Sequence, residues 1–596
     1  MCGIVAYLGQ EAASPILLRG LEKLEYRGYD SAGIFVGEAA GKGHLIKRSG
    51  PLKNLRQALP EALPGQVGLG HTRWATHGEP SEANAHPHVS ADGRLVLVHN
   101  GVVDNYQALR AQYLPDLQLK SSTDTEVLVN LIAHFKAAGE TTQEALRLAL
   151  NEVQGSYALA LLDIAKPDEL WVAKRRSPLL IGLGEDFKTV VSDALATDDL
   201  TIDYIELEDN DMAQLTRETC QIWSASREVV SRPLLQVKPS GLAVDLAQYD
   251  SYMAKEIAEE PAVIKRLCEK YLGQESYHFQ ADLLNTMQAS DRLYFVACGT
   301  SWHASLLAAR YLEAALDIPA EVHLASEFSY YPPRLSARPF FIFLSQSGET
   351  ADTLQVQGKI ASLKAPSLAV TNAQNSSLAR QATFVLPLYA GPEIAVASTK
   401  AYVAQVFLFQ VLAACLKKNP VPVFREQAAS LIAGMETILQ EAERFQQLAR
   451  RYFTGQEAAF YIGRGLDQFT SYEAALKLKE ISYLYAEGFA AGELKHGSIA
   501  LIQAGLPVIA ILTEGKTSEV LRSNIEEVKT RGAHVLTIAS QALAQENDTI
   551  ILPPVAAGFE PLLSILPTQY LAYEVAKLRG LNVDKPRNLA KSVTVE

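Results

Sequence analysis

An internal repeat in the second half of the chain most strongly constrains its fold. Three strand-like segments recur at a spacing of 166 or 167 residues, pairing 293–299 with 459–465, 340–348 with 507–515, and 382–387 with 548–553. In the first two pairs a glycine-bearing loop and a helix follow the strand, which is the unit of a doubly wound parallel sheet. The sequence therefore predicts two copies of one α/β subdomain, joined near residues 418–422.

The chain before the repeat predicts a separate domain of α+β character. The full chain of 596 residues is too long for one hydrophobic core and indicates about three domains. Pro239 and Gly241 lie in a linker-like stretch. We expect the following divisions: a first domain at 2–238, a linker at 239–250, two α/β subdomains at 251–421 and 422–585, and a docked tail at 586–596. A helix is also expected over 252–272.

Charge and cysteine content exclude several classes of protein. The net charge of −13 argues against a nucleic-acid partner, because phosphate backbones attract Lys and Arg. Five scattered cysteines without a C-x-x-C pair fit a reducing compartment and argue against a disulfide framework. The N-terminus shows no signal-peptide pattern, and the apolar run 401–416 is too short to span a bilayer. We expect a cytoplasmic protein without a membrane partner.

Cys2 follows the initiator methionine directly. Processing normally removes a methionine before a small residue, which would give Cys2 a free α-amino group. A thiol and an amine on one residue can act as a nucleophile and its base. A cysteine at this position is more often an ordinary small residue, so the hypothesis requires a supporting site elsewhere in the chain.

One candidate for that site is the His-Asn-Gly step at residues 99–101. It is predicted as a loop directly after a strand at 95–99. The side-chain amide of Asn100 and the N–H of Gly101 suit a developing oxyanion. A plain turn fits the same residues.

A second candidate is the polar stretch 70–78, also predicted as a loop. Its Arg73 would bind a carboxylate if it lines a pocket. Asp124, in the first turn of a helix predicted over 123–135, could hold an ammonium. Together these two charges would suit an α-amino acid, whereas a surface charge and a helix-start acid are the alternatives.

Five of the twelve histidines fall in this region, namely His71, His77, His86, His88 and His99. They show no helical H-x-x-x-H pair, and Pro87 separates two of them. We therefore expect no metal site.

The first repeat copy carries hydroxyl-rich loops at 298–301, 345–350 and 397–400. Such loops follow the carboxyl ends of strands, where open parallel sheets bind ligands. Glycine, hydroxyls and a helix N-terminus together predict a phosphate cradle, although a capped helix start would explain any one loop alone. The second copy has an acid, Glu514, at the equivalent place. We expect one phosphate site per chain, in the first copy.

Acid–base residues gather in the second copy. Glu473, Lys477 and Glu480 share one face of a predicted helix, as a solvated stripe of charges would also do. With His496 they form the set needed to open a sugar ring and move a proton between carbons. The C-terminal tail is either frayed or docked, and a docked tail could bring Lys591 to a carbonyl as a Schiff-base amine.

These motifs, in this order, resemble the isomerising glutamine–fructose-6-phosphate aminotransferases, the glucosamine-6-phosphate synthase family. The resemblance covers essentially the whole chain and rests on residues 1–5, 26–33, 70–78, 99–101, 122–126, 298–301, 345–350, 493–497 and 586–596. It implies an N-terminal-nucleophile αββα sandwich followed by two sugar-isomerase (SIS) subdomains. It also implies glutamine and fructose 6-phosphate as substrates, no cofactor, and a homodimer.

The resemblance implies a role for each candidate residue. In the first domain it implies Cys2 as the nucleophile, with Asn100 and Gly101 as the oxyanion hole. Arg73 and Asp124 would bind glutamine, with Thr76 and His77 nearby. Trp74 would gate the passage of ammonia. In the second half it implies a phosphate-binding set: Thr300, Ser301, Ser345, Gln346, Ser347 and Thr350, with Ser398 close by. It further implies that Glu480 moves the proton between carbons and that Lys477 assists at the oxygen. His496 of a neighbouring subunit would open the sugar ring, and Lys591 would form the Schiff base.

Two departures from the family pattern lie outside these residues, at 463–469 and at 497–499. Two other functions remain open. The same halves could form a glutaminase joined to a sugar-phosphate lyase. A sensor without activity would need only the phosphate cradle, and the candidate catalytic residues argue against it.

Overall fold

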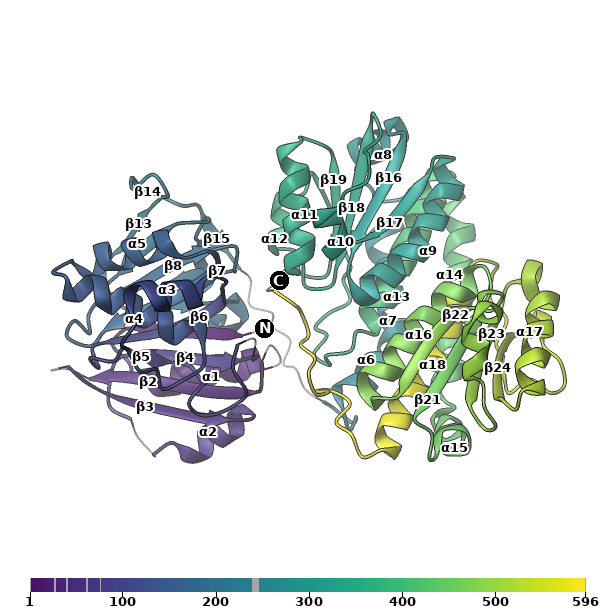
Figure 1. Ribbon diagram of the computed structural model, residues 1–596. Coiled ribbons are helices and arrows are strands. Elements are labelled where there is room, and N and C mark those ends of the chain that lie inside the picture. The colour runs from purple at the N-terminus through teal and green to yellow at the C-terminus, as the bar shows by residue number, and fades with distance from the viewer. Residues whose placement is uncertain are drawn as a thin grey trace. The chain divides into compact units, whose positions relative to one another are not determined.

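The computed structural model describes residues 2–25, 28–38, 41–60, 63–75, 77–237 and 246–594. The chain forms two compact units, Met1–Ala243 with Ser592–Glu596, and Val244–Lys591. Each unit is described by itself (Figure 1). Parts of the predicted linker, of the motif at 26–33 and of the tail, and the whole of Thr76, lie outside the described residues.

The first unit contains two antiparallel sheets. One has eight strands in the order β15-β11-β9-β10-β1-β4-β2-β3, and the other has seven in the order β14-β13-β12-β8-β7-β6-β5. The first comprises β1 (Gly3–Leu8), β2 (Ser31–Glu38), β3 (Lys42–Ser49), β4 (Val67–Arg73), β9 (Leu180–Leu183), β10 (Lys188–Val191), β11 (Asp203–Glu206) and β15 (Leu234–Gln236). The second comprises β5 (His88–Val89), β6 (Leu95–Val103), β7 (Gly155–Asp163), β8 (Leu170–Arg175), β12 (Met212–Leu215), β13 (Cys220–Trp223) and β14 (Val229–Val230).

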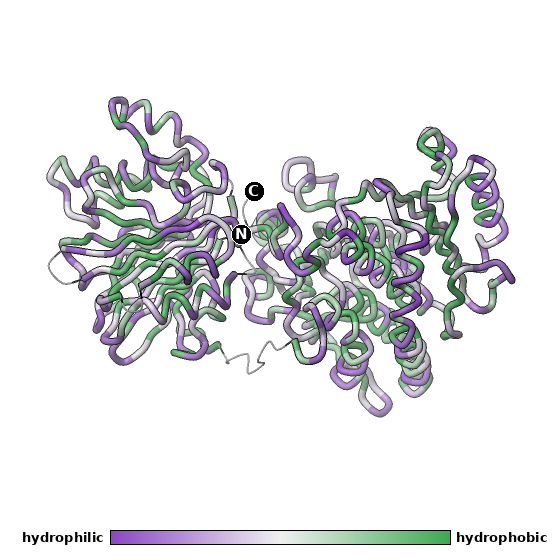
Figure 2. The backbone as a smooth tube through the Cα atoms, turned by 90° about the horizontal axis from the view of Figure 1, so that it is seen from below, coloured by the Kyte–Doolittle hydropathy of each residue, from purple (hydrophilic) through white to green (hydrophobic). Residues whose placement is uncertain are grey.

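Alternating side chains divide the first unit into four layers. In β1, Ile4 and Leu8 pack between the two sheets, whereas Val5 and Tyr7 pack toward α1 (Ala13–Leu24) and α2 (Leu52–Ala58). A further apolar cluster joins the second sheet to α3 (Tyr106–Tyr113), α4 (Asp124–Ala137) and α5 (Thr142–Glu152). Hydrophobic segments follow the strands of this unit (Figure 2). The short helix η2 (Ala194–Thr197) completes the unit, and the predicted αββα sandwich is confirmed.

The second unit confirms the repeat as two five-stranded parallel sheets. Their strand orders are equivalent, β17-β16-β18-β19-β20 and β22-β21-β23-β24-β25. The first half comprises α8 (Ala281–Ala289), β16 (Arg292–Ala297), α9 (Gly299–Leu316), β17 (Ala320–Leu324), α10 (Ala325–Tyr330), β18 (Pro339–Ser345), α11 (Ala351–Ser362), β19 (Ser367–Thr371), α12 (Ser377–Gln381), β20 (Phe384–Pro387) and α13 (Lys400–Leu416). The second half comprises α14 (Val421–Leu439), α15 (Ala442–Phe453), β21 (Ala458–Gly463), α16 (Leu466–Ser482), β22 (Tyr485–Ala490), η3 (Glu493–His496), η4 (Ser498–Leu501), β23 (Pro507–Leu512), η5 (Gly515–Thr517), α17 (Ser518–Thr530), β24 (His534–Ser540), η6 (Gln541–Leu543), β25 (Ile550–Leu552) and α18 (Glu560–Leu578).

The helix predicted over 252–272 is two helices, α6 (Tyr252–Ala258) and α7 (Glu260–Tyr271). The break coincides with Pro261, whose missing N–H suits the first turn of a new helix.

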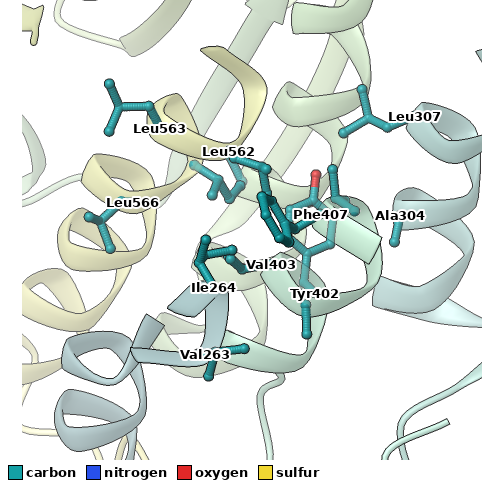
Figure 3. Packing of buried hydrophobic residues seen from close by; sticks show 14 of the residues in the cluster. Val263, Ile264, Ala304, Leu307, Tyr402, Val403, Phe407, Leu562, Leu563 and Leu566 are labelled. Carbon is teal, nitrogen blue, oxygen red and sulfur yellow. The ribbon is translucent and has the colours of Figure 1, made fainter. Parts of the chain in front are cut away.

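One apolar cluster joins the two halves of the second unit. In Figure 3, Tyr402 and Phe407 of α13 lie between side chains of α9 and α18, including Leu307 and Leu562. Every residue of α13 except Cys415 is buried, which explains why its sequence is apolar on all sides. No helix in the described part of the chain is both long and apolar enough to cross a membrane.

Candidate active site

Cys2 lies immediately before β1, beside the end of β4. The Trp74 N–H donates to Cys2 Sγ at 3.2 Å, and the thiol lies 3.5 Å from the Trp74 carbonyl oxygen. The pairing of Gly3 with Thr72 sets this register. Burial raises the pKa of the Cys2 thiol, so a nearby base is required to generate the nucleophilic thiolate.

Asn100 and Gly101 lie within β6, so their predicted placement in a loop after the strand is wrong. Gly101 has φ 138°, and a Cβ at this position would lie 2.2 Å from the Ser156 carbonyl oxygen. The neighbouring strand β7 therefore approaches too closely for any side chain. Asn100 Nδ2 donates to the Cys2 carbonyl oxygen at 2.9 Å, which places the amide beside the candidate nucleophile.

The stretch predicted as a loop over 70–78 begins as strand, because β4 continues to Arg73. Arg73 is buried, and its guanidinium donates to the carbonyl oxygens of His77 and, at 3.0 Å, Gly78. These bonds fold the following turn around the arginine. The ring of Trp74 meets Tyr29 edge-on, with the ring centroids 5.9 Å apart.

Asp124 is buried at the start of α4, where Thr123 accepts the Glu126 N–H as the predicted cap. Asp124 Oδ2 accepts the Val103 N–H at 2.8 Å. Burial lowers the pKa of Arg73, and the charge of Asp124 acts in the opposite direction. The two charges predicted to hold an amino acid therefore act on each other within one buried region.

The phosphate-cradle residues follow two neighbouring strands. The strand order places β17 and β18 on opposite sides of β16, so the crevice after β16 and β18 is a topological switch point. Ser345 Oγ accepts the Gly348 N–H and lies 3.0 Å from Thr350 Oγ1. The Glu349 N–H bonds to Ser347 Oγ at 3.2 Å. These bonds hold a tight turn with hydroxyls around it.

The remaining cradle residues are Gln346 of this turn and, in the first turn of α9, Thr300 and Ser301. Gln346 is partly exposed, and its carbonyl oxygen accepts the Asn372 N–H. The loop predicted over 298–301 is wrong beyond Cys298, because α9 begins at Gly299. Within α9, Ser301 Oγ accepts from Gln405 Nε2 at 2.9 Å. Thr300 Oγ1 accepts from Lys477 Nζ at 2.8 Å, which connects the first turn of α9 to α16 of the second half.

The charged face of α16 is largely buried, with Glu480 19% exposed in its side chain, so its reading as a solvated stripe is wrong. Lys477 Nζ lies 2.7 Å from Glu480 Oε2 and 3.4 Å from Glu473 Oε1. Both Lys477 and Glu473 are at most 1% exposed. Burial acts to lower the pKa of Lys477, but the two carboxylates outweigh it and the pKa is raised.

His303 belongs to this cluster and was missed from the sequence. Its Nδ1 lies 2.7 Å from Glu473 Oε2. A sequence signal existed, because His303 lies one helical turn after Thr300 of the predicted loop. Its partner could not be predicted from local spacing, because Glu473 lies 170 residues away in the sequence.

The tail is docked at Lys591, whose side chain is only 3% exposed, as the docked alternative requires. Its Nζ donates to Glu393 Oε2 at 2.5 Å and to the Ala395 carbonyl oxygen at 2.8 Å. Ser398 Oγ donates to the same Glu393 oxygen at 3.0 Å. The Lys591 charge holds the pKa of Glu393 below its usual value against the effect of burial. Glu393 is a further site residue that the sequence reading missed.

His496 lies apart from these clusters. It is exposed at the end of η3, and no hydrogen bond within the described residues joins it to Lys477, Glu480 or Lys591. The described ranges also contain no group of three or more His, Cys, Asp or Glu side chains placed to hold a metal ion.

Comparisons with known proteins agree with this two-part arrangement. A glutamine amidotransferase domain model matches residues 61–187, and an SIS domain model matches residues 286–415 and 452–579. The isomerizing glutamine–fructose-6-phosphate aminotransferase of Lactiplantibacillus plantarum is 50% identical over 605 residues, covering 100% of both chains. That of Bacillus subtilis is 47% identical, with the same coverage.

A solved structure resembles the second unit. The C-terminal domain of glucosamine-fructose-6-phosphate aminotransferase from Francisella tularensis is 31% identical with a TM-score of 0.54. It covers 58% of this chain and 100% of that domain. The chain is therefore an enzyme that catalyses glutamine-dependent, isomerising amino transfer, and it belongs to the isomerizing glutamine–fructose-6-phosphate aminotransferase family.

Proposed function

We propose that the chain releases ammonia from glutamine at Cys2 and transfers it to fructose 6-phosphate at Lys591, giving glutamate and glucosamine 6-phosphate. The observation that carries this proposal is Lys591, whose buried side chain donates to the Glu393 carboxylate and to the Ala395 carbonyl oxygen. Burying an ammonium costs on the order of several kcal/mol of desolvation. A lysine kept in such a place is therefore a candidate Schiff-base amine.

The glutamine half-reaction starts from Cys2 after Met1 has been removed. The α-amine takes the thiol proton, and the thiolate attacks the glutamine amide carbon. Asn100 Nδ2–H and Gly101 N–H stabilise the oxyanion. The protonated amine gives its proton to the leaving nitrogen, so ammonia departs and a thioester remains. Water then attacks the thioester and releases glutamate and the thiol.

Other side chains hold the glutamine and guide the ammonia. Arg73 pairs with the substrate carboxylate and Asp124 with its ammonium. His77 and Thr76 complete the proposed group of glutamine-binding residues. Trp74 gates the passage of ammonia.

In the sugar half-reaction, the phosphate occupies the cradle formed by Thr300, Ser301, Ser345, Gln346, Ser347 and Thr350, with Ser398 close by. His496 of a partner subunit opens the ring. Lys591 adds to the C2 carbonyl and loses water to form an imine, which ammonia then displaces. Glu480 moves a proton from C1 to C2, and Lys477 assists at the oxygen. Substrates and side chains supply every group, so the proposed steps require no cofactor.

The proposal includes a homodimer, because His496 is to act in the partner's site. It divides the chain at 2–238, 239–250, 251–421, 422–585 and 586–596. It places the enzyme in the cytoplasm, where a reducing environment keeps the free thiol of Cys2 available.

Two variants test the halves separately. Cys2→Ala should abolish glutamine hydrolysis and leave fructose 6-phosphate binding intact. Lys591→Ala should abolish glucosamine 6-phosphate formation and leave glutamine hydrolysis measurable, whereas Lys585→Ala, directly before the tail, should behave as wild type. Normal synthesis by Lys591→Ala would remove that lysine from the mechanism. Absence of glucosamine 6-phosphate from the wild-type reaction with both substrates would favour the lyase alternative.

A further inference from the structure

Four histidines form a buried cluster behind Asn100. They are His71 of β4, His86, His88 of β5 and His99 of β6, all at most 5% exposed. The ring centroids of His71 and His86 lie 4.2 Å apart, and those of His86 and His88 lie 4.8 Å apart. Such a cluster in a core requires a reason, because imidazole nitrogens are costly to bury without partners.

Hydrogen bonding settles which nitrogen of His71 carries the proton. Its Nε2 lies 2.9 Å from Asn100 Oδ1 and 3.2 Å from the His99 carbonyl oxygen. Both neighbours are acceptors only, so Nε2 is the donor. His71 Nδ1 is buried and has no hydrogen-bond partner among the described residues, so a proton there would be unsatisfied.

The imidazole rings of this cluster remain neutral at physiological pH. Burial lowers the pKa of His71 to about 3 and holds the pKa values of His86 and His88 well below the ordinary value. Neighbouring rings would also repel a charge on any one of them. His71 therefore presents the same N–H donor to Asn100 throughout the working range.

Two histidines of the cluster also contact the start of α4. His88 Nε2 lies 3.1 Å from Thr123 Oγ1, and His99 Nδ1 lies 2.9 Å from Thr125 Oγ1. These hydroxyls flank Asp124. The same group of rings thus contacts both the Asn100 amide and the helix turn that carries the proposed ammonium ligand.

We propose that His71 is a positioning residue of the glutamine half-reaction, whose Nε2–H fixes the Asn100 amide with its NH₂ group turned toward Cys2. The inference rests on the proposed role of Asn100 in the oxyanion hole. Without the His71 donor, the amide can rotate and present its oxygen to the developing oxyanion. Loss of one oxyanion-hole donor costs roughly 100-fold or more in kcat.

The test compares two substitutions in the full-length enzyme. His71→Leu removes the donor, whereas His71→Gln places an amide N–H at a similar reach. We expect His71→Leu to lower kcat for glutamine hydrolysis about 100-fold, with KM for glutamine changed less than about threefold. His71→Gln should recover most of this loss. His44→Leu, at an exposed histidine of β3, is the matched control.

Two further measurements separate positioning from damage to the fold. Alkylation of Cys2 by iodoacetamide develops no oxyanion, so its rate in His71→Leu should match wild type. A parallel loss of alkylation and hydrolysis, or a kcat that His71→Gln does not recover, would overturn the inference. If Asn100→Ala retains full kcat, the proposed oxyanion hole itself is wrong. If Asn100→Ala loses activity and His71→Leu does not, only the positioning role fails.

Discussion

Glu256 shows how one buried side chain can make stability depend on pH. Its Oε1 accepts the N–H groups of Ile394 and Ala395, and its Oε2 has no partner among the described residues. Burial, reinforced by the neighbouring Glu393 carboxylate, raises the pKa of Glu256 to about 8. The folded enzyme therefore holds a proton on Glu256 at neutral pH.

Glu256→Gln should become more stable relative to wild type as the pH rises. The unfolded chain releases this proton near the ordinary pKa of about 4.3. The stability contributed by protonated Glu256 is thus complete below that value and is lost as the pH rises through about 8. The slope is at most about 1.4 kcal/mol per pH unit for one proton. Glutamine cannot ionise and keeps the acceptor oxygen.

The measurement is the melting temperature of both proteins between pH 6 and pH 8. The exposed Glu269→Gln of α7 is the control and should follow wild type. Parallel curves for wild type and Glu256→Gln would show that Glu256 is ionised in the folded enzyme.

At the scale of elements, α16 begins on a side-chain carboxylate. The Leu466 N–H donates to Glu514 Oε2 at 2.9 Å. Gly465 has φ 60°, and a Cβ there would lie 1.6 Å from that oxygen. Through the 167-residue spacing, Glu514 corresponds to Ser347 of the proposed phosphate cradle. Since helix starts favour anions, the second copy fills its own anion position with a carboxylate.

Glu514→Ser should weaken this helix start and make it responsive to phosphate. Loss of a cap costs roughly 0.5–2 kcal/mol. A cavity of about 620 Å³ adjoins Gly465 and Glu514, so an anion has room to enter. Inorganic phosphate should raise the melting temperature of Glu514→Ser more than that of wild type or of Glu519→Ser, a control in the first turn of α17. Equal shifts in all three would contradict this account.

Glu473→Gln tests the buried face of the same helix. The change removes one of the two carboxylates that raise the pKa of Lys477. That pKa should fall, so the alkaline limb of the pH profile for glucosamine 6-phosphate synthesis should move to lower pH. Glutamine hydrolysis should be unaffected, and the exposed Glu487→Gln of β22 serves as the control. An unmoved alkaline limb would show that Lys477 does not set it.

At the scale of the whole molecule, complementation tests whether His496 acts in a partner's site. His496→Ala and Glu480→Gln should each abolish synthesis. Subunits of the two variants, mixed under conditions that allow exchange, should regain activity, because one site of each mixed dimer would contain Glu480 from one chain and His496 from the other. Mixtures that stay inactive although mass measurement shows mixed dimers would place His496 in its own chain's site.

Features carried by short-range patterns were predictable from the sequence. The strand at Gly3–Leu8, the Thr123 cap of α4 and the repeated strands all follow from periodicity and local chemistry. Strand boundaries were predicted less accurately where a polar residue lies within a strand. Asn100 and Gly101 look like a turn, yet strand β7 pairs with them and extends β6.

The sequence by itself determined the two parallel-sheet copies and local elements such as the strand at Gly3–Leu8, because strand and helix formation depends on residues near one another in the chain, whereas the sandwich was implied by the family resemblance. Only the tertiary structure decided which charges are buried and which partners they have. His303 meets Glu473 across 170 residues, and Lys591 meets Glu393 across 198. Burial and long-range pairing depend on how distant segments pack together, and neither is encoded in local spacing.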